Sequence, residues 1–185
     1  LAIGQPLVRG GEHPWLFFNS AELEELRQQR DTGTRAAIWT NITRWAHWCA
    51  QQPVRSRWIP TVDPDPQSEN LYDRFYAAMH DLAVVEHLAF ASALSDPERD
   101  PYFQPARAWL LGAARVWGNE KNNAPDASKA YAVLRITKGL AVGYDLLHNR
   151  LTADEQSEVR QAIVGVAQAY HEFFQDKAVA GAGYN

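Results

Sequence analysis

Apolar side chains recur at intervals of three and four residues along most of this chain, which is the spacing of one face of an α-helix. The segment that follows residue 33, for example, places Ile38, Ile42 and Trp45 on one side of a helix. No stretch alternates apolar and polar residues for long enough to predict a strand. We therefore expect an all-α fold, with helices over about residues 21–30, 34–51, 70–94, 102–116, 129–148 and 153–175.

The last two predicted helices show how these elements are joined. The first of the two is apolar along most of its length, and a short polar turn follows it after Leu147. Thr152 and Glu155 then form a capping box, in which each side chain accepts a hydrogen bond from a backbone N–H at the helix start. Repeated pairs of this kind predict antiparallel helix hairpins, an arrangement typical of a helical toroid or solenoid.

Two stretches of the chain are rich in helix breakers. Residues 1–19 contain Gly4, Gly10 and Pro14, so we expect an extended segment whose apolar end packs on the helices. Ser20 is expected to cap the first helix. Residues 53–69 contain four prolines, and loops of this length usually serve a site or cross a surface. The chain is therefore divided into an extended segment, 1–19, and a helical portion, 20–185.

Composition and charge narrow the possible partners. The formal net charge is −4 and no dense run of Lys and Arg occurs, so nucleic-acid binding is not expected, because it needs a basic surface. No apolar run approaches the roughly 20 residues of a membrane-spanning helix. The single cysteine, Cys49, lies on a helix and is expected to be a small buried apolar residue.

The aromatic content is the unusual part of the composition. The 185 residues include seven Trp and seven Tyr. Flat aromatic faces stack on sugar rings, and amphipathic aromatic side chains are common in binding clefts. The same side chains also pack well in helix hairpins, so the composition leaves both roles open for each of them.

Three groups of polar and aromatic residues are candidates for binding an anionic sugar. The start of the third helix carries an arginine, whose planar guanidinium suits bidentate binding of a carboxylate. The proline-rich loop before it pairs a cation with a tryptophan. The loop before the fifth helix carries two amide side chains, and the start of the fifth helix carries two basic ones. Solvated helix starts, polar turns and surface ion pairs are the alternative interpretations. The candidates are Arg57, Trp58, Asn70, Tyr72, Arg74, Tyr76, Asn122, Asn123, Lys129 and Arg135.

The sequence predicts no metal and no other cofactor. His80 and His87 are seven residues apart on one predicted helix, about 10.5 Å along its axis, which is too far for both to bind one ion. The chain has no paired cysteines, no His-Glu-x-x-His and no Asp-rich calcium loop. Glycosidase chemistry needs two opposed carboxylates, and no spacing in the sequence selects such a pair.

Three segments, taken in order, resemble a known family. They are the stretch His-Pro-Trp-Leu-Phe-Phe with the helix after it (residues 13–27), the helix pair over residues 88–110, and Gly-Leu-Ala-Val-Gly-Tyr-Asp-Leu-Leu with the following turn (residues 139–155). Together they are similar to the N-terminal helical domain of the heparinase II/III-like polysaccharide lyases, whose relatives include alginate lyases and uronyl epimerases. The resemblance covers most of the chain.

The resemblance implies part of an incomplete (α/α) toroid with a long cleft, and cleavage of a glycosidic bond beside a uronic acid by β-elimination. In that reaction the uronate carboxyl is neutralised, a base removes the proton on C5, and an acid protonates the leaving oxygen. Tyr184 and Asn185 lie nearest the expected catalytic segment. They are the catalytic candidates, Asn185 for the carboxyl and Tyr184 as base or acid, and a chain terminus without a catalytic role is the alternative.

The resemblance also implies a larger enzyme, of which this chain is a fragment, in the periplasm or secreted. Its expected partners are an acidic polysaccharide or oligosaccharide and the C-terminal remainder of the same enzyme. Two other functions stay open. One is an (α/α)-barrel glycoside hydrolase, and the other is a non-catalytic helical domain that binds glycans or acts as a scaffold.

Overall fold

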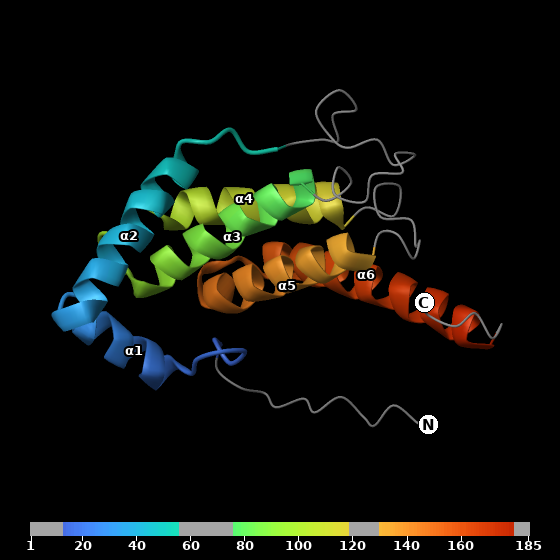
Figure 1. The fold of residues 1–185 in the computed structure, drawn as a ribbon, viewed down its shortest axis with the longest axis horizontal. Coiled ribbons are helices and arrows are strands. Elements are labelled where there is room, and N and C mark those ends of the chain that lie inside the picture. The colour runs from blue at the N-terminus through green and yellow to red at the C-terminus, as the bar shows by residue number, and fades with distance from the viewer. Residues whose placement is uncertain (1–12, 56–75, 119–129, 180–185) are drawn as a thin grey trace.

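A computed structural model of the protein describes residues 13–55, 76–118 and 130–179 (Figure 1). Within these ranges all the regular structure is helical, which confirms the all-α prediction. The elements are α1 (Ser20–Gln29), α2 (Gly33–Ala50), α3 (Tyr76–Leu94), α4 (Phe103–Trp117), α5 (Ala130–Leu147), the 3₁₀ turn η2 (His148–Arg150) and α6 (Ala153–Val179).

The helix boundaries lie close to those that the apolar spacing predicts, with one correction at α1. The N-cap of α1 is Asn19, whereas Ser20 was expected. The Asn19 side chain accepts a hydrogen bond from the Glu22 backbone N–H, and the Glu22 carboxylate accepts one from the Asn19 N–H. The helix is therefore capped one residue earlier than predicted, and by a capping box, because Glu22 stands three residues after Asn19. The predicted start of the third helix, residues 70–75, lies outside the described residues.

The predicted capping box at the start of α6 is present. The Thr152 backbone N–H donates to the Glu155 carboxylate at 3.0 Å, and the Glu155 N–H donates to the Thr152 hydroxyl. The Arg107 guanidinium of α4 also pairs with Glu155, and it is the main reason why the pKa of that carboxyl is below its usual value. A carboxyl with a lowered pKa stabilises the fold above its unfolded-state pKa, and this contribution is lost as the pH falls through the folded-state pKa.

The last four α-helices form two hairpins that pack side by side (Figure 1). In the space between α3 and α5, Leu82 lies against Gly139 and Val85 lies against Gly143, so these two helices run in the same direction. In the other layer, Arg107 and Arg115 of α4 pair with successive acidic residues near the start of α6. The α3–α4 and α5–α6 hairpins therefore stack in parallel, with first helix beside first helix and second beside second.

The main core lies among α3, α4 and α5. Val85, Leu88, Leu110, Ile136 and Leu140 are all fully buried there. Cys49 of α2 is buried at the edge of the same core, as the sequence predicts, and burial raises the pKa of its thiol. No helix in the described ranges has the length and apolar character needed to cross a membrane.

Two glycines allow α3 and α5 to approach each other closely. A Cβ atom added to Gly139 would lie 2.6–2.9 Å from three carbon atoms of the Leu82 side chain. A Cβ atom on Gly143 would lie 2.6 Å from the Val85 side chain. These separations are shorter than van der Waals contact, so the two glycines, four residues apart on α5, set the distance between the hairpins.

The change Gly139→Ala is expected to lower the free energy of unfolding by about 1–3 kcal/mol, because the new methyl group overfills a packed interface. Gly165→Ala is the matched control, since Gly165 lies inside α6 with nothing within 4 Å of its added Cβ atom. That change is expected to stabilise the protein by up to about 1 kcal/mol through helix propensity. Urea unfolding of both variants measures the difference, and equal effects would contradict the close approach.

The segment before α1 is anchored on the C-terminal end of α5. The buried Asp145 carboxylate accepts hydrogen bonds from the backbone N–H groups of Trp15 and Leu16, and it lies 2.7 Å from Nδ1 of His13. His13 also stacks on the ring of His148, with centroids 3.8 Å apart. Residues 13–18 are therefore docked on the helices, as the sequence predicts.

Candidate functional site

Most of the sequence-predicted site residues lie outside the described residues. Tyr76 begins α3, but its side chain is not among the described ones. Arg135 lies on α5 with an exposed side chain. The candidates outside the described residues are Arg57, Trp58, Asn70, Tyr72, Arg74, Asn122, Asn123, Lys129, Tyr184 and Asn185.

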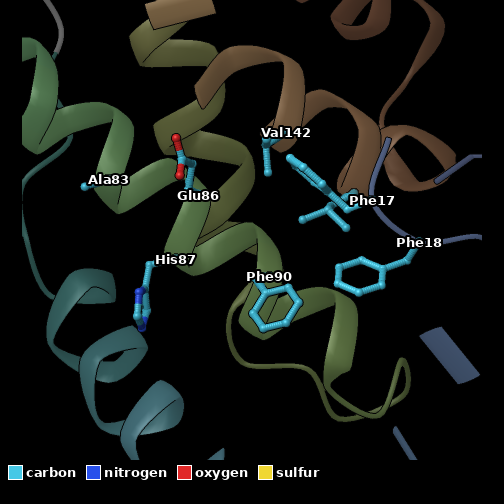
Figure 2. Close-up of a pocket in the computed structure, with 8 residues that line it drawn as sticks. Phe17, Phe18, Ala83, Glu86, His87, Phe90 and Val142 are labelled. Carbon is cyan, nitrogen blue, oxygen red and sulfur yellow. The ribbon is translucent and has the colours of Figure 1, made fainter. Parts of the chain in front are cut away.

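The described residues contain a groove of about 340 Å³ beside α3 (Figure 2). Its floor is one side of α3, where Ala83, Glu86 and Phe90 stand at helical spacing. Ala83 is exposed and has only a methyl side chain, so it leaves space above the helix. α5 and the anchored N-terminal segment supply one wall, and His87 marks the side toward α2. The lining residues are Phe17, Phe18, Ala83, Glu86, His87, Phe90, Val142 and Leu146.

One end of the groove is aromatic. Figure 2 shows Phe18 beside Phe90, with Phe17 close to Val142. The rings of Phe18 and Phe90 are stacked, with centroids 6.0 Å apart and planes 29° apart. Phe17 and Phe18 reach this position because Asp145 holds the backbone just before them. This end therefore offers apolar faces that two distant parts of the sequence supply.

The other end of the groove carries polar groups. Glu86 of α3 accepts a hydrogen bond from Lys138 Nζ of α5 at 2.8 Å. His87 Nε2 lies 3.2 Å from the backbone carbonyl oxygen of Ile42 on α2. A carbonyl oxygen only accepts, so Nε2 of His87 carries a hydrogen, and that ring is fixed against α2.

The predicted binding residue Arg135 lies on the same side of α5 as the groove wall. It precedes Lys138, Val142 and Leu146 by three, seven and eleven residues, which is helical spacing along one face. Arg135 therefore continues this wall by one turn beyond Lys138. At the end away from the phenylalanines, the α5 wall therefore carries two cations, Lys138 and Arg135.

A cluster of aromatic rings lies farther toward the start of α3. Neighbouring rings in the series Trp45, Trp48, His80 and Trp109 have centroids 6.1, 6.3 and 6.3 Å apart, and each pair meets edge to face. Trp45 and Trp48 are 52% and 44% exposed, whereas Trp109 is buried. The series therefore runs from the solvent-facing side of α2 to the core.

A buried carboxylate stands behind His80. Asp81 is 1% exposed. Its Oδ2 atom accepts hydrogen bonds from Arg55 Nε at 2.5 Å and from Trp117 Nε1 at 2.9 Å. Its Oδ1 atom lies 3.3 Å from Nδ1 of His80, whose side chain is half exposed. The Arg55 guanidinium also lies over the Trp117 ring, 5.8 Å from its centroid. Asp81 of α3 thus contacts Arg55, which follows α2, and Trp117 of α4, and its other oxygen faces the half-exposed imidazole of His80.

The groove and the aromatic cluster lie along one side of α3. His80, Ala83, His87 and Phe90 follow helical spacing over about 15 Å of its axis. α2 runs beside this stretch in the opposite direction, because Trp48 contacts His80 whereas the earlier residue Ile42 contacts His87. The candidate functional site is this side of α3, with exposed tryptophans at one end and phenylalanines at the other.

Sequence reasoning missed the centre of this site. His80 was considered only as a metal ligand, and Trp45 only as part of the apolar face of its helix. A His-Asp pair at residues 80–81, on the helix that follows a helix with three tryptophans, was the signal present in the sequence. Their meeting depends on how α2 packs on α3, which the apolar spacing does not define.

Comparison with known proteins does not assign the chain to a family. No protein-family model matches the chain, and no curated protein matches its sequence.

Proposed function

We propose that this chain is the helical, glycan-binding portion of a polysaccharide lyase that cleaves uronic-acid-containing glycans by β-elimination. The observation that carries the proposal is the exposed pair Trp45 and Trp48 beside the half-exposed His80. Exposed indole faces stack on sugar rings, and an imidazole at their edge supplies a polar contact to hydroxyl groups.

The arrangement of the helices supports the same proposal. Two helix hairpins stack in parallel, which is the repeating unit of an (α/α) toroid or solenoid. The resemblance to heparinase II/III-like lyases is carried in part by His13, Trp15 and Asp145, and these three residues contact one another. Two of the resembling segments thus form one structural unit. A toroid of which this chain is one part remains the proposed architecture.

The proposed substrate is an acidic glycan. Arg135 and Lys138 place two cations on the α5 wall, although Glu86 already pairs with Lys138. A uronate carboxylate is attracted to such a wall, and the aromatic residues at both ends contact the apolar faces of the sugar rings. Tyr184 and Asn185 remain the proposed catalytic residues of this chain, with Asn185 on the carboxyl and Tyr184 as base or acid. The C-terminal remainder of the enzyme is the proposed partner, and the periplasm or the exterior the proposed location.

The test is incubation of the natural protein that contains this chain with alginate, heparin, hyaluronan and polygalacturonate. A lyase releases a 4,5-unsaturated uronate, so near-ultraviolet absorbance is expected to rise together with the number of reducing ends. Reducing ends without that absorbance would show a hydrolase. Binding without any new chain ends would show a non-catalytic glycan-binding domain.

A matched pair of variants ties this activity to the site. The double change Trp45→Ala and Trp48→Ala removes two exposed indoles and is expected to weaken glycan binding by about tenfold or more, which corresponds to about 1.4 kcal/mol for the pair. Ile38→Ala is the control, because Ile38 is an equally exposed apolar residue of the same helix. Equal binding by the two variants would rule out the tryptophan surface as the binding site.

A further inference from the structure

The Asp81 carboxylate determines which ring nitrogen of a neutral His80 carries the hydrogen. Nδ1 of His80 faces Oδ1 of Asp81 at 3.3 Å. The Asp81 carboxylate is ion-paired with Arg55, so it only accepts hydrogen bonds. Nδ1 must therefore carry the hydrogen of the neutral ring, and Nε2 keeps its lone pair. In this tautomer, Nδ1 donates to the carboxylate and Nε2 is free to accept a hydrogen bond from another group.

The surroundings of His80 leave its ring accessible to a ligand. Its side chain is 50% exposed, and it meets the exposed Trp48 at an interplanar angle of 82°. Because the two rings are in contact and both are partly exposed, a ligand on this surface can reach the Trp48 indole and the His80 imidazole together. Sugar rings carry hydroxyl groups on their rim, and a hydroxyl is the donor that Nε2 requires.

The buried indole N–H of Trp109 is a second polar group near the His80 ring. It contacts His80 with centroids 6.3 Å apart and is 2% exposed. Its Nε1–H has no hydrogen-bond partner among the described residues. A buried donor without a partner is costly, so a water or ligand group that accepts from it would stabilise this part of the cluster.

We infer that His80 is a specificity-determining residue of a pyranose-binding subsite: the sugar ring stacks on Trp48, and one of its hydroxyl groups donates a hydrogen bond to Nε2 of His80. Asp81 is the positioning residue, because it holds His80 in the tautomer with hydrogen on Nδ1. Arg55 and Trp117 in turn hold Asp81 through its other oxygen. The subsite deepens the proposed glycan-binding function and rests on it.

Two variants of His80 separate the hydrogen bond from the packing. His80→Phe keeps a ring between Trp48 and Trp109 but has no acceptor, whereas His80→Gln keeps an acceptor on a side chain of similar reach. With a size-defined oligogalacturonate or oligomannuronate as the probe, His80→Phe is expected to weaken binding by about five- to tenfold, the value of one net hydrogen bond. His80→Gln is expected to stay within about twofold of the wild type. Thermal unfolding of both variants confirms that they remain folded.

The binding measurements distinguish an error in the proposed subsite from an error in the proposed function. If Trp48→Ala weakens binding while His80→Phe does not, the tryptophan surface binds glycans and the role of His80 is wrong. If neither the wild-type protein nor any variant binds the oligouronates, the proposed function is wrong as well.

The tautomer has a readout that does not depend on any ligand. Long-range ¹H–¹⁵N NMR spectra at a pH where His80 is neutral distinguish the two ring nitrogens by their chemical shifts. The Nδ1–H pattern is expected for His80 in the wild type, and Asp81→Asn is expected to change the balance of tautomers. An Nε2–H pattern in the wild type would overturn the role of Asp81.

Discussion

Replacing Asp81 with alanine is expected to lower the free energy of unfolding by about 3–5 kcal/mol, the cost of breaking a buried ion pair from one side. The change removes the Asp81 carboxylate that pairs with the Arg55 guanidinium, which is itself largely buried. It also leaves the Nε1–H of the buried Trp117 without the acceptor that Asp81 provides. Chemical denaturation followed by tryptophan fluorescence measures the loss.

Two further variants show whether charge or size is responsible. Asp81→Asn keeps the shape and one carbonyl acceptor, so it is expected to cost less than the alanine change. Asp96→Ala is the control, because Asp96 is an exposed aspartate two residues after the end of α3 whose carboxylate accepts a local hydrogen bond from the Glu98 backbone N–H, and losing such a bond is expected to cost only about 0.5–1.5 kcal/mol. A loss for Asp81→Ala no larger than that of the control would refute the buried ion pair.

The sequence predicted the helices well because helix formation depends on neighbours along the chain. The spacing of apolar residues and the Thr152–Glu155 capping box are local signals, and both are confirmed. The error at α1 has a local cause too. Asn19 and Ser20 are adjacent and both residue types are good caps, so only the position of Glu22 distinguishes them.

The candidate site could not be predicted in the same way because its parts are distant in sequence. Asp81 meets Arg55, 26 positions before it, and Trp117, 36 positions after it. Helix α3 is apolar on nearly all its sides, since it packs on α2, α4 and α5. Its sequence therefore does not show that the side with Ala83 and Phe90 borders a groove. That side is defined only when the neighbouring helices are in place.

Sequence reasoning sought binding residues in loops and at helix starts, where function often lies. Arg135 is the predicted residue whose side chain the structure describes, and it stands on the groove side of α5. The remaining predictions on loops stay predictions. The described part of the site lies instead on the sides of helices, where aromatic residues such as Trp45 combine packing on one edge with exposure on the other.

Replacing Asp145 with alanine is expected to lower the free energy of unfolding by about 2–4 kcal/mol and to release the segment before α1. This one carboxylate accepts hydrogen bonds from the backbone N–H groups of Trp15 and Leu16 and pairs with His13. Bonds to a charged acceptor are worth about 1.5–3 kcal/mol each, but part of this returns when the released N–H groups bind water. Urea unfolding measures the stability, and hydrogen exchange measures the protection of the two backbone N–H groups.

Asp154→Ala is the matched control, because Asp154 is an exposed aspartate in the first turn of α6 and its loss is expected to cost less than about 1 kcal/mol. If Asp145→Ala destabilises the protein without faster exchange at Trp15 and Leu16, the carboxylate does not anchor this segment. Faster exchange is the expected result, and it has a consequence for the groove. Phe17 follows the anchored residues directly, so its release removes part of the aromatic wall beside α3. The same variant therefore tests whether the aromatic end of the groove depends on a single buried carboxylate.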